Sequence, residues 1–511
     1  MHISLFHLVA ALGLSAVGEA KKKSCACNNA ALEHCLKAHG VAFKVSCDAD
    51  WETYSTPLNL RVPVKQAVIA LPNDSKQVSA AVVCARKNGL KVQAKSGGHS
   101  YGGYSNVGID GQVEVDLRNL NKTVLSSDGS VAVVGGGVKL GPMATAIYAQ
   151  GKRAIPHGIC GGVGIGGHST HGGWGFTSRA WGLTLDHIVE MQVVLANGTE
   201  ARASPNVNAD LYWALRGAAD SLAIVTSFSL STQPAPEEVV NFNYEIRDIL
   251  KSVDQAVSAF THLQSFISNA TTVDRRTSFS LQTHYGPDRA TGEIVKTFLI
   301  QGTFLGSLAK YKASIEPEML RGLPAPTASD VQAKDWIASL TALSPDGRLT
   351  GEALYLAFFA NSVTVDDPGM NEAALRRYFT YMLEGPPSPG VAYQSNMELW
   401  GGADTQINLP AKDAKFAAFP HRNIFWTAHN LAQAAPNATF PPEGITWLNG
   451  LRQAILQDLD VGSAAYQNLL DTSLTRDEAH ALYYGDEVLG RLRGIKKMHD
   501  PKDVFWNPQS V

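Results

Sequence analysis

The 511-residue chain has no excess of charge of either sign, and charged side chains are scarce altogether. It contains 43 Lys and Arg against 46 Asp and Glu, a net charge of −3, so nothing favours nucleic acid or an anionic membrane as a partner. Charged residues make up 17% and hydrophobic residues 45% of the chain, against about 25% charged in an average soluble protein. This composition excludes a disordered or coiled-coil chain and provides for large cores. At roughly 150 residues per domain, the length predicts more than one substructure.

Apolar runs long enough to span a bilayer are also missing. Residues 4–17 form one short run near the N-terminus, below the ~20 residues that a membrane helix needs. The small residues Gly18 and Ala20 follow it, as at a signal-peptidase site. We therefore expect a cleaved signal peptide at 1–20 and a secreted, extracellular protein. N-x-S/T sequons agree with secretion, at Asn73, Asn121, Asn197, Asn269 and Asn437.

Cysteines are few and clustered near the N-terminus. This pattern is typical of disulfides that fasten an N-terminal segment in an oxidising compartment. A metal site at Cys25-x-Cys27 is disfavoured, because neither a second Cys pair nor a His pair follows at ligand spacing. The last cysteine stands alone within a glycine run. The cysteines are Cys25, Cys27, Cys35, Cys47, Cys84 and Cys160.

Internal repeats and low-complexity tracts are absent as well, and the pattern of apolar residues divides the chain in two. From 60 to 232, short apolar runs alternate with turns, which indicates α+β structure with mixed sheets. A helix is predicted from Asp74 to about residue 88, and another from near Pro142, since proline suits the first turn. Strands are predicted at 67–71, 90–95, 113–117, 131–134 and 187–195.

From 236 to 460, amphipathic helical stretches alternate with strand-like runs. Strands that face a layer of helices predict a second α+β domain. Residues 461–511 then return to short strand and helix patterns. The helices are expected at 249–268, 307–319 and 371–383, the strands at 276–283, 296–304, 353–360 and 391–399, and loops at 322–326 and 386–389.

Two glycine-rich loops contain most of the candidate cofactor-binding residues. The first, residues 95–103 (KSGGHSYGG), directly follows a predicted strand. Consecutive glycines let backbone N–H groups converge on an anion, because no Cβ blocks the approach, and this suits a pyrophosphate. The alternative is an ordinary glycine-rich turn with an incidental histidine.

The second loop, residues 157–168 (HGICGGVGIGGH), continues into residues 171–175 (HGGWG). Gly162-x-Gly164-x-x-Gly167 matches a dinucleotide fingerprint formally, but it lies in mid-domain within a glycine run where chance matches are easy. We therefore reject a Rossmann site. The glycines favour a flat cofactor lying against the backbone. Residue types alone also allow zinc at His157, Cys160, His168 and His171.

The two loops occur in order with three further motifs: HGGWGFTSRAWGLTLDHIVEMQVVLANG, ADLYWALRG and the C-terminal HDPKDVFWNPQS. Over about residues 31–511, this order resembles the fungal berberine-bridge-enzyme-like FAD-linked oxidases of the vanillyl-alcohol-oxidase superfamily, such as gluco- and chito-oligosaccharide oxidases. The resemblance implies a two-domain α+β fold. An FAD-binding domain at 31–235 is completed by a C-terminal segment at 461–511, and residues 236–460 form a substrate-binding domain, an antiparallel sheet covered by helices.

The resemblance also implies FAD attached at two points, with His99 bonded to the 8α-methyl carbon and Cys160 to C6 of the flavin ring. Such links hold the flavin rigidly and raise its potential as a hydride acceptor. Residues 217–223 depart from the family pattern, which has a glycine cluster there. Further FAD contacts are implied at Ser96, Gly97, Gly98, Ser100, Gly166, Gly167, His168, Gly172, Gly175, Ile224 and Val225.

By the same analogy Cys35 pairs with Cys84, which leaves Cys25, Cys27 and Cys47 without an assigned pairing. Val163 occupies a position where valine leaves oxygen access to the flavin in related enzymes. That residue favours an oxidase that produces hydrogen peroxide.

Oxidation of an alcohol needs a base that takes the hydroxyl proton. The resemblance places this base at Tyr466, in a motif whose second tyrosine is here replaced by Leu469. A free phenol has a pKa near 10, so Tyr466 needs help from a neighbouring group. We expect that help from Glu398.

Glu398 lies in a stretch where carbohydrate-oxidising relatives carry Trp-x-Gln-x-Asp. Here the stretch reads Gln394-x-Asn396-x-Glu398, and a further sugar-facing glutamine is replaced by His429. Gln394, Asn396 and His429 are the expected substrate contacts, and Tyr101 and Tyr104 offer aromatic contact. The alternative is an ordinary strand with outward polar residues.

The sequence thus predicts a secreted, monomeric FAD-dependent oxidoreductase acting on CH–OH groups, with O2 as acceptor and no metal, membrane or nucleic-acid partner. The expected reaction converts C1 of a mono- or oligosaccharide to a lactone. The altered substrate contacts leave oxidation of a secondary metabolite open as the alternative. A non-catalytic flavoprotein or a carbohydrate-binding module leaves Tyr466 and Glu398 without a purpose, and a zinc hydrolase is the remote alternative.

Overall fold

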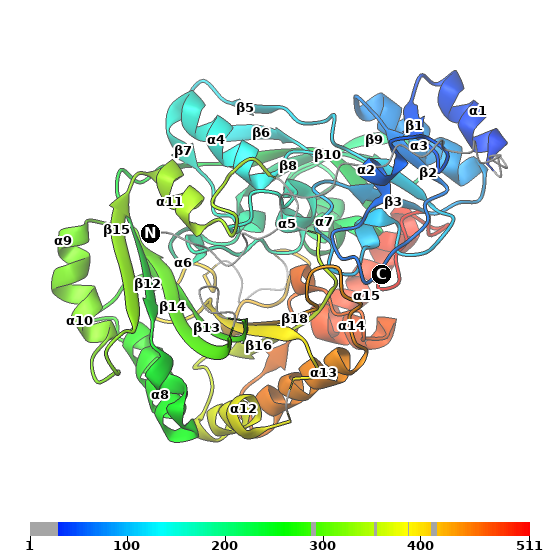
Figure 1. Cartoon of the computed structure of the whole chain (residues 1–511). Coiled ribbons are helices and arrows are strands. Elements are labelled where there is room, and N and C mark those ends of the chain that lie inside the picture. The colour runs from blue at the N-terminus through cyan, green and yellow to red at the C-terminus, as the bar shows by residue number, and fades with distance from the viewer. Residues whose placement is uncertain (1–28, 288–292, 352–354, 387, 410–415) are drawn as a thin grey trace, which may run out of the picture.

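The structure is a computed structural model that describes residues 29–287, 293–351, 355–386, 388–409 and 416–511. The predicted signal peptide, Cys25 and Cys27 lie outside these residues. Three larger sheets of four, five and eight strands organise the chain (Figure 1). This mixture of helices with mixed and antiparallel sheets confirms the predicted α+β class. Within the described residues, no helix combines the length and the apolar character needed to cross a membrane.

The N-terminal sheet has the strand order β1-β2-β4-β3. Its elements are β1 (Ala42–Lys44), β2 (Val68–Leu71), β3 (Val92–Lys95) and β4 (Val113–Asp116), with α1 (Ala30–Ala38), α2 (Trp51–Ser55) and α3 (Ser75–Lys87). β1 is antiparallel to β2, whereas β2, β4 and β3 are parallel. The Asp74 side chain accepts the backbone N–H of Gln77 and so caps α3, as expected from its sequence.

The second sheet is antiparallel throughout and has the order β5-β6-β10-β8-β9. Its strands are β5 (Thr123–Leu125), β6 (Val131–Gly135), β8 (Ile188–Leu195), β9 (Glu200–Ala203) and β10 (Ala223–Ser231). Its core is shared with two helices, α4 (Leu140–Gly151) and α7 (Ala209–Ala218). Smaller elements accompany it, namely α5 (Ile165–Thr170), α6 (Ser178–Trp181) and the paired strands β7 (Arg153–Ala154) and β11 (Gln233–Pro234).

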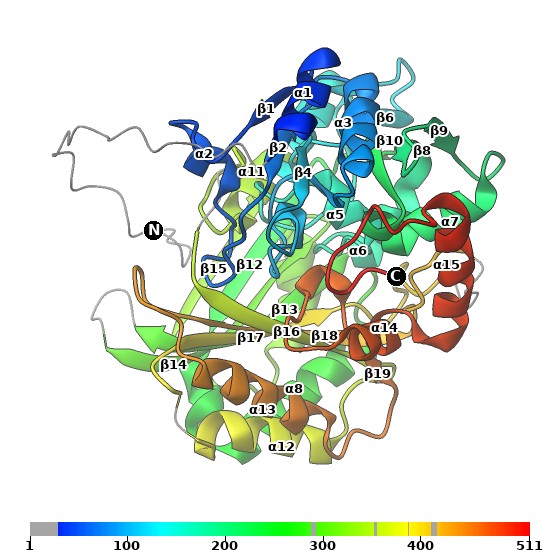
Figure 2. The same cartoon turned by 90° about the vertical axis from the view of Figure 1, so that its right-hand side faces the viewer.

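The third sheet is antiparallel and has the order β15-β12-β14-β13-β17-β18-β16-β19. Its strands are β12 (Val239–Glu245), β13 (Thr277–Pro287), β14 (Ile294–Phe304), β15 (Ala328–Lys334), β16 (Phe358–Asp366), β17 (Ala392–Leu399), β18 (Ile424–Gln433) and β19 (Ser463–Ala464). Three helices cover one face around a large apolar core, and Figure 2 shows them below the sheet. They are α8 (Val253–Ser268), α12 (Glu372–Glu384) and α13 (Glu443–Leu456).

The C-terminal segment returns to the first half of the chain. It contains α14 (Arg476–Tyr483) and α15 (Gly485–His499), and its end lies beside β3 in Figure 1. Phe505 forms a parallel bridge to Val92. The buried ammonium of Lys496 forms an ion pair with Asp500 and donates to the carbonyls of Ser221 and Phe505. These contacts place the chain end against the residues that follow α7.

Two predicted elements differ from the structure. The strand expected at 353–360 begins only at Phe358 and continues to Asp366, and residues 352–354 lie outside the described part. The helix expected at 307–319 is divided into α9 (Leu308–Lys310), a π-helical turn (Tyr311–Ile315) and α10 (Glu316–Met319). In that turn the buried Tyr311 hydroxyl lies 3.1 Å from the Tyr244 hydroxyl, so a tertiary contact accompanies the irregular turn.

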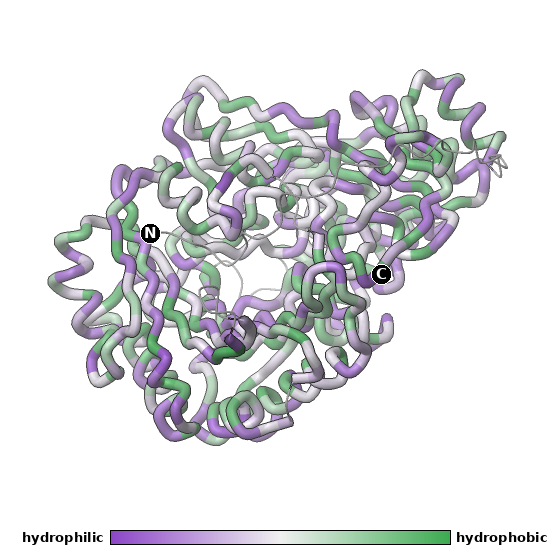
Figure 3. The backbone as a smooth tube through the Cα atoms, viewed as in Figure 1, coloured by the Kyte–Doolittle hydropathy of each residue, from purple (hydrophilic) through white to green (hydrophobic). Residues whose placement is uncertain are grey.

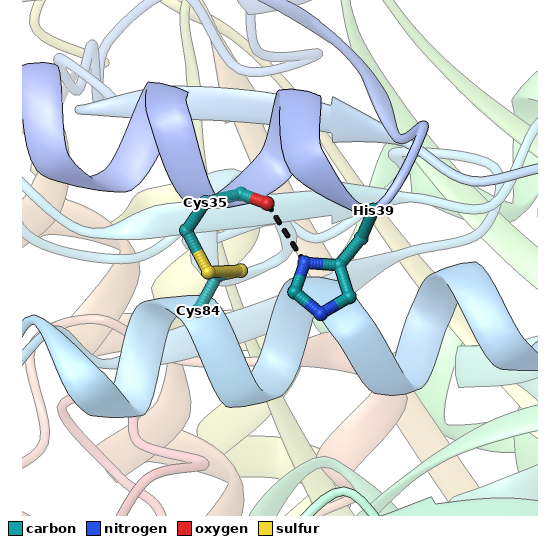
Figure 4. A group of neighbouring side chains, drawn as sticks. All are labelled: Cys35, His39 and Cys84. Atoms are coloured by element: carbon teal, nitrogen blue, oxygen red, sulfur yellow. Dashed lines mark hydrogen bonds between the residues drawn. A yellow bond between two sulfur atoms is a disulfide. The ribbon is translucent and has the colours of Figure 1, made fainter.

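The disulfide implied between Cys35 and Cys84 is present and joins α1 to α3, with a Cα–Cα distance of 5.8 Å (Figure 4). Cys47 is also disulfide-bonded. Within the described residues, Cys35, His39 and Cys84 are the one group whose potential metal-ligand atoms lie close together. The two cysteine sulfur atoms are bonded to each other in the disulfide. His39 Nδ1 donates to the Cys35 carbonyl at 2.9 Å. This group is therefore a structural cross-link.

Candidate active site

The two glycine-rich loops lie directly against each other. A Cβ on Gly97 would come within 2.2 Å of the Gly164 backbone nitrogen, and a Cβ on Gly164 within 2.0 Å of the Gly97 nitrogen. Ser96 Oγ joins the loops to β6 and α5, because it donates to the Gly136 carbonyl at 2.6 Å and accepts the Gly166 N–H at 3.3 Å. Only glycine allows backbones to approach this closely.

A cavity of about 1640 Å³ lies between these loops and the third sheet. Ligand sites for drug-sized molecules measure roughly 300–1,000 Å³, so this one has room for a large cofactor together with a second molecule. Most residues predicted for the site line it. They are Ser96, Gly97, Gly98, His99, Ser100, Tyr101, Tyr104, Cys160, Val163, Gly166, Gly167, His168, Ile224, Val225, Gln394, Asn396, Glu398, His429 and Tyr466.

Gly172 and Gly175, also predicted as FAD contacts, are not among the lining residues. Gly172 has a φ of +116°, and a Cβ there would lie 2.8 Å from the ring of Tyr466. A Cβ on Gly175 would lie 1.9 Å from the His157 carbonyl oxygen. Their role in this structure is to permit close packing behind the cavity wall.

His99 and Cys160 are nucleophilic side chains in this wall. Burial, together with the nearby charge of Lys139, lowers the pKa of His99 to about 4, so its imidazole is neutral at neutral pH. Its Nε2 is buried without a hydrogen-bond partner among the described residues. Cys160 is outside any disulfide, and burial raises the pKa of its thiol to about 12. An imidazole with an unpartnered Nε2 and a thiol outside any disulfide, both lining one cavity, fit a covalently attached ring system.

Of the four residues considered for zinc, the three histidines have separate partners. His157 Nδ1 lies 2.8 Å from the Gly158 carbonyl, and His168 Nε2 accepts the Gly158 N–H at 3.2 Å. His171 Nε2 lies 3.3 Å from Asp220 Oδ1. Burial lowers the pKa of His168 to about 3, so this imidazole is neutral. The rings therefore order the loop and the cavity wall.

Three N–H donors converge on the phenolic oxygen of Tyr466. They are the backbone N–H groups of Gly173 at 2.9 Å and Trp174 at 3.2 Å, and the side-chain amide of Asn468 at 2.9 Å. Burial raises the pKa of Tyr466 to about 12, although all three donors act to lower it. Asn468 was missed as a site residue, and its position two residues after Tyr466 in the same motif is the signal that could have found it.

A row of polar side chains from β17 forms the opposite wall. Along this strand Gln394, Asn396 and Glu398 line the cavity, whereas the intervening Met397 is part of the apolar core on the other face. Hydrophobic and hydrophilic positions follow each other in short alternation along the strands of this sheet (Figure 3). The register continues the polar row onto β13 and β18, where Gln282 and His429 both lie opposite Asn396.

Glu398 has a different partner from the one expected. Its Oε1 lies 3.6 Å from His429 Nδ1, and His429 Nε2 lies 3.5 Å from the Tyr101 hydroxyl. The negative charge of Glu398 acts to raise the pKa of Tyr466, after the larger effect of burial. The groups that favour the Tyr466 phenolate are therefore Asn468 and the two backbone N–H groups.

The stretch that departs from the family pattern also reaches the cavity. Asp220 lines it, with one carboxylate oxygen near His171 and the other accepting the side-chain N–H of Asn507 at 2.8 Å. Position 217 still requires a glycine, because a Cβ there would lie 2.2 Å from the Ala418 carbonyl oxygen. Asp220 thus links the glycine loop to the C-terminal segment, a role that the sequence alone did not reveal.

The cavity between the two glycine-rich loops and the third sheet has the size and the glycine-lined wall that suit a large cofactor. Comparisons with known proteins show which family the chain belongs to. Residues 66–204 match the family model described as FAD binding domain, and residues 465–511 match that described as berberine and berberine like. A xylooligosaccharide oxidase from Thermothelomyces thermophilus is 33% identical over 489 residues, covering 94% of each chain. The chain belongs to the berberine-bridge-enzyme-like FAD-linked oxidases. It is an FAD-dependent oxidoreductase.

Solved structures agree with this assignment. The xylooligosaccharide oxidase from Myceliophthora thermophila C1 in complex with xylobiose superposes with a TM-score of 0.86 at 30% identity, covering 94% of this chain and 99% of the other. The glucooligosaccharide oxidase from Acremonium strictum, described as carrying 6-S-cysteinyl, 8α-N1-histidyl FAD, gives 0.85 at 30% identity with the same coverage. These likenesses confirm the predicted two-domain fold.

Proposed function

We propose that this protein is a secreted oxidase whose FAD is bonded to both His99 and Cys160, and that it oxidises a CH–OH carbon while reducing O2 to H2O2. The expected substrate is a mono- or oligosaccharide oxidised at C1 to a lactone. One observation carries the proposal. A single cavity joins the two nucleophiles His99 and Cys160 with the Tyr466 hydroxyl and the polar row of β17.

The bicovalent attachment is supported by chemistry on both loops. His99 offers a neutral imidazole and Cys160 a thiol outside any disulfide. The glucooligosaccharide oxidase that this chain resembles is described with one histidyl and one cysteinyl bond to its FAD. The cavity, at about 1640 Å³, leaves space for substrate beside the cofactor.

In the proposed mechanism the bound FAD supplies the hydride acceptor. Tyr466 takes the proton of the reacting hydroxyl, and the N–H groups of Gly173, Trp174 and Asn468 hold its oxygen in place. Asn396 and Gln394 orient the substrate from the sheet side. Val163 lies in the cavity wall close to Cys160, its N–H donating to the Cys160 carbonyl, and is the residue proposed to leave oxygen access.

The secondary-metabolite alternative has an observation in its favour. An apolar cluster faces the same cavity, with the rings of Tyr101 and Phe358 edge to face at 5.0 Å. Leu58, Leu356 and Leu431 extend it. Such a surface suits the aliphatic or aromatic part of a less polar substrate.

Secretion is supported by the surface positions of the sequons and by the disulfides. The asparagines of all these sequons are exposed: Asn73, Asn121, Asn197, Asn269 and Asn437. Expression in a eukaryotic host should give a glycoprotein in the medium, and endoglycosidase treatment should lower its mass.

Acid precipitation of the purified protein tests the attachment, and a peroxide assay over neutral oligosaccharides tests the reaction. Yellow colour should stay with the precipitate in wild type and in both single variants, His99→Ala and Cys160→Ala, and be released only from the double variant. Colour released from wild type contradicts covalent attachment. A panel with no peroxide-forming sugar, together with turnover of a less polar alcohol, favours the alternative substrate class.

A further inference from the structure

Asp220 places a carboxylate in the wall of the cavity, in the stretch 217–223 where this chain departs from the glycine cluster of its family. Its chain neighbours Ala219 and Ser221 are buried. By contrast, 30% of the surface of the Asp220 side chain remains accessible. Because Asp220 lines the cavity and the chain on either side of it is buried, this accessible surface faces the space that suits the cofactor.

Three donors hold the carboxylate of Asp220 in place and leave part of it unused. His171 Nε2 lies 3.3 Å from Oδ1, and the Ser221 hydroxyl donates to the same oxygen at 3.4 Å. The side-chain amide of Asn507 donates to Oδ2 at 2.8 Å. A carboxylate oxygen has two lone pairs. Among the described residues, Oδ1 therefore has both acceptor positions filled, whereas Oδ2 keeps one for a further donor.

The surroundings of Asp220 favour the ionised carboxylate. Burial acts to raise the pKa of this carboxyl, yet the pKa lies below its ordinary value, because His171 and Asn507 favour the charged form. The His171 ring faces a second acceptor on its other side, with Nδ1 3.1 Å from the Gly167 carbonyl. An ionised carboxylate only accepts hydrogen bonds. A cofactor group that meets Oδ2 must therefore be a donor.

FAD carries donor hydroxyls on its ribityl chain and on its ribose, whereas its phosphates are anionic acceptors. In dinucleotide-binding proteins an Asp or Glu hydrogen-bonds a ribose hydroxyl, so the pairing is chemically well suited. We propose that the Asp220 carboxylate accepts a hydrogen bond from a sugar hydroxyl of bound FAD and is a cofactor-binding residue of this chain. FAD as cofactor follows from the family, so this contact depends neither on the proposed substrate nor on the covalent attachment.

FAD titration of the full-length chain tests the contact. The variant His99→Ala/Cys160→Ala is the background, because FAD should be exchangeable there, and the change in flavin fluorescence measures its Kd. Asp220→Asn keeps the size of the side chain but removes its charge and turns one oxygen into a donor. It should raise the Kd of FAD by about 10- to 100-fold. An unchanged Kd overturns the proposal.

Three fragments of the cofactor identify the hydroxyl. Riboflavin carries the ribityl chain without the ribose, ADP carries the ribose without the ribityl chain, and lumiflavin carries the flavin ring with neither. Weaker binding of riboflavin alone to Asp220→Asn assigns the contact to the ribityl chain, and weaker binding of ADP alone assigns it to the ribose. Any other pattern, such as weaker binding of lumiflavin, indicates a general disturbance of the cavity and overturns the specific contact.

Asn507 provides the matched control. It donates to Asp220, but it is not among the residues that line the cavity. Asn507→Ala removes this internal hydrogen bond and leaves the carboxylate in place, so it should weaken FAD binding much less than Asp220→Asn does. Equally weak binding in the two variants would make Asp220 only a link to the C-terminal segment and overturn its contact with FAD.

A second measurement keeps both anchors, His99 and Cys160. Full-length apoprotein is incubated with increasing FAD, and the flavin that stays with the acid precipitate is followed over time. Asp220→Asn should raise the FAD concentration that gives the half-maximal rate by about 10- to 100-fold and leave the limiting rate unchanged, because the contact acts in binding. A change in the limiting rate alone overturns the proposal.

Failure of the covalent attachment is distinguishable from failure of this contact. If wild type incorporates no acid-stable flavin, the proposed attachment is wrong, and its FAD is then exchangeable. The same titration on chains with both anchors intact, with and without Asp220→Asn, then decides on Asp220. Equal Kd values overturn the contact, and a Kd raised by about 10- to 100-fold supports it.

Discussion

The phenolic oxygen of Tyr466 lies 2.9 Å from the side-chain nitrogen of Asn468, two residues further along the chain. With the N–H groups of Gly173 and Trp174, this contact gives the oxygen three donors. Hydrogen bonds to the charged form of a group lower the pKa of an acid. Burial acts in the opposite direction and prevails, which leaves the pKa of Tyr466 at about 12.

Replacement of Asn468 by alanine should therefore raise the pKa of Tyr466 further. A hydrogen bond to a charged group contributes about 1.5–3 kcal/mol, which corresponds to a loss of at least about tenfold in kcat/KM at pH 7. The rise of kcat/KM with pH, which follows deprotonation of Tyr466, should move to higher pH. The profile of kcat/KM over a sugar that gives peroxide measures both effects.

Gln467→Ala serves as the control, because the side chain of this adjacent residue donates to the Tyr484 hydroxyl instead. It should leave the pH at which kcat/KM rises unchanged. An Asn468→Ala variant with wild-type kcat/KM and pH profile contradicts a role of Asn468 in holding the base.

A methyl group on Gly164 should separate the two glycine loops. Its Cβ would lie 2.0 Å from the Gly97 nitrogen, so the backbones must move apart. We expect Gly164→Ala to lose most bound flavin, measured as the ratio of visible to ultraviolet absorbance. Gly494→Ala on α15 is the matched control, since no atom lies within 4 Å of the added Cβ, and a helix gains about 0.5–1 kcal/mol from this change. Equal flavin content in both variants contradicts the close-contact role.

The sequence predicted strands and helices best where one local pattern decides them. The strand expected at 391–399 is present as β17 (Ala392–Leu399). It was predictable because its polar and apolar residues alternate, which places them on opposite faces of the sheet. The strand β18 was not predicted. It contains the consecutive polar residues His429 and Asn430, which interrupt a simple alternation, and its place in the sheet depends on pairing with β16 and β17, which a local pattern does not reveal.

For the site, too, the sequence predicted what local motifs decide and missed what depends on the arrangement of distant segments. His99, Cys160 and Tyr466 were found because they stand in recognisable motifs, and all three line one cavity. The partner of Glu398 was not found, because Glu398 and His429 come from different strands and meet only through the register of the sheet. Contacts between distant segments depend on topology, whereas motif residues carry their signal in the sequence itself.

The Cys35–Cys84 disulfide should contribute substantially to stability. It closes a loop with a sequence separation of 49 residues, for which chain entropy gives about 4 kcal/mol. Cys35→Ser should lower the midpoint of thermal unfolding, measured by circular dichroism. The double variant Cys35→Ser/Cys84→Ser should show the same loss, because one cross-link is removed in either case. An unchanged midpoint in both contradicts the contribution.

Asn396 offers a buried acceptor to the substrate. Its side-chain Oδ1 is buried and has no hydrogen-bond partner among the described residues, while the residue lines the cavity between Gln282 and His429. A substrate hydroxyl that donates to this oxygen would gain about 0.5–1.5 kcal/mol. Asn396→Leu, similar in size, should therefore raise KM by about 2- to 10-fold.

This contact is made equally in the ground state and the transition state, so kcat should change little. The thermal unfolding midpoint should not fall, because an unpaired buried polar atom is removed. Steady-state peroxide formation over a range of sugar concentrations separates the two constants. A variant with lowered kcat and unchanged KM would instead place Asn396 among the groups that act on the reacting carbon.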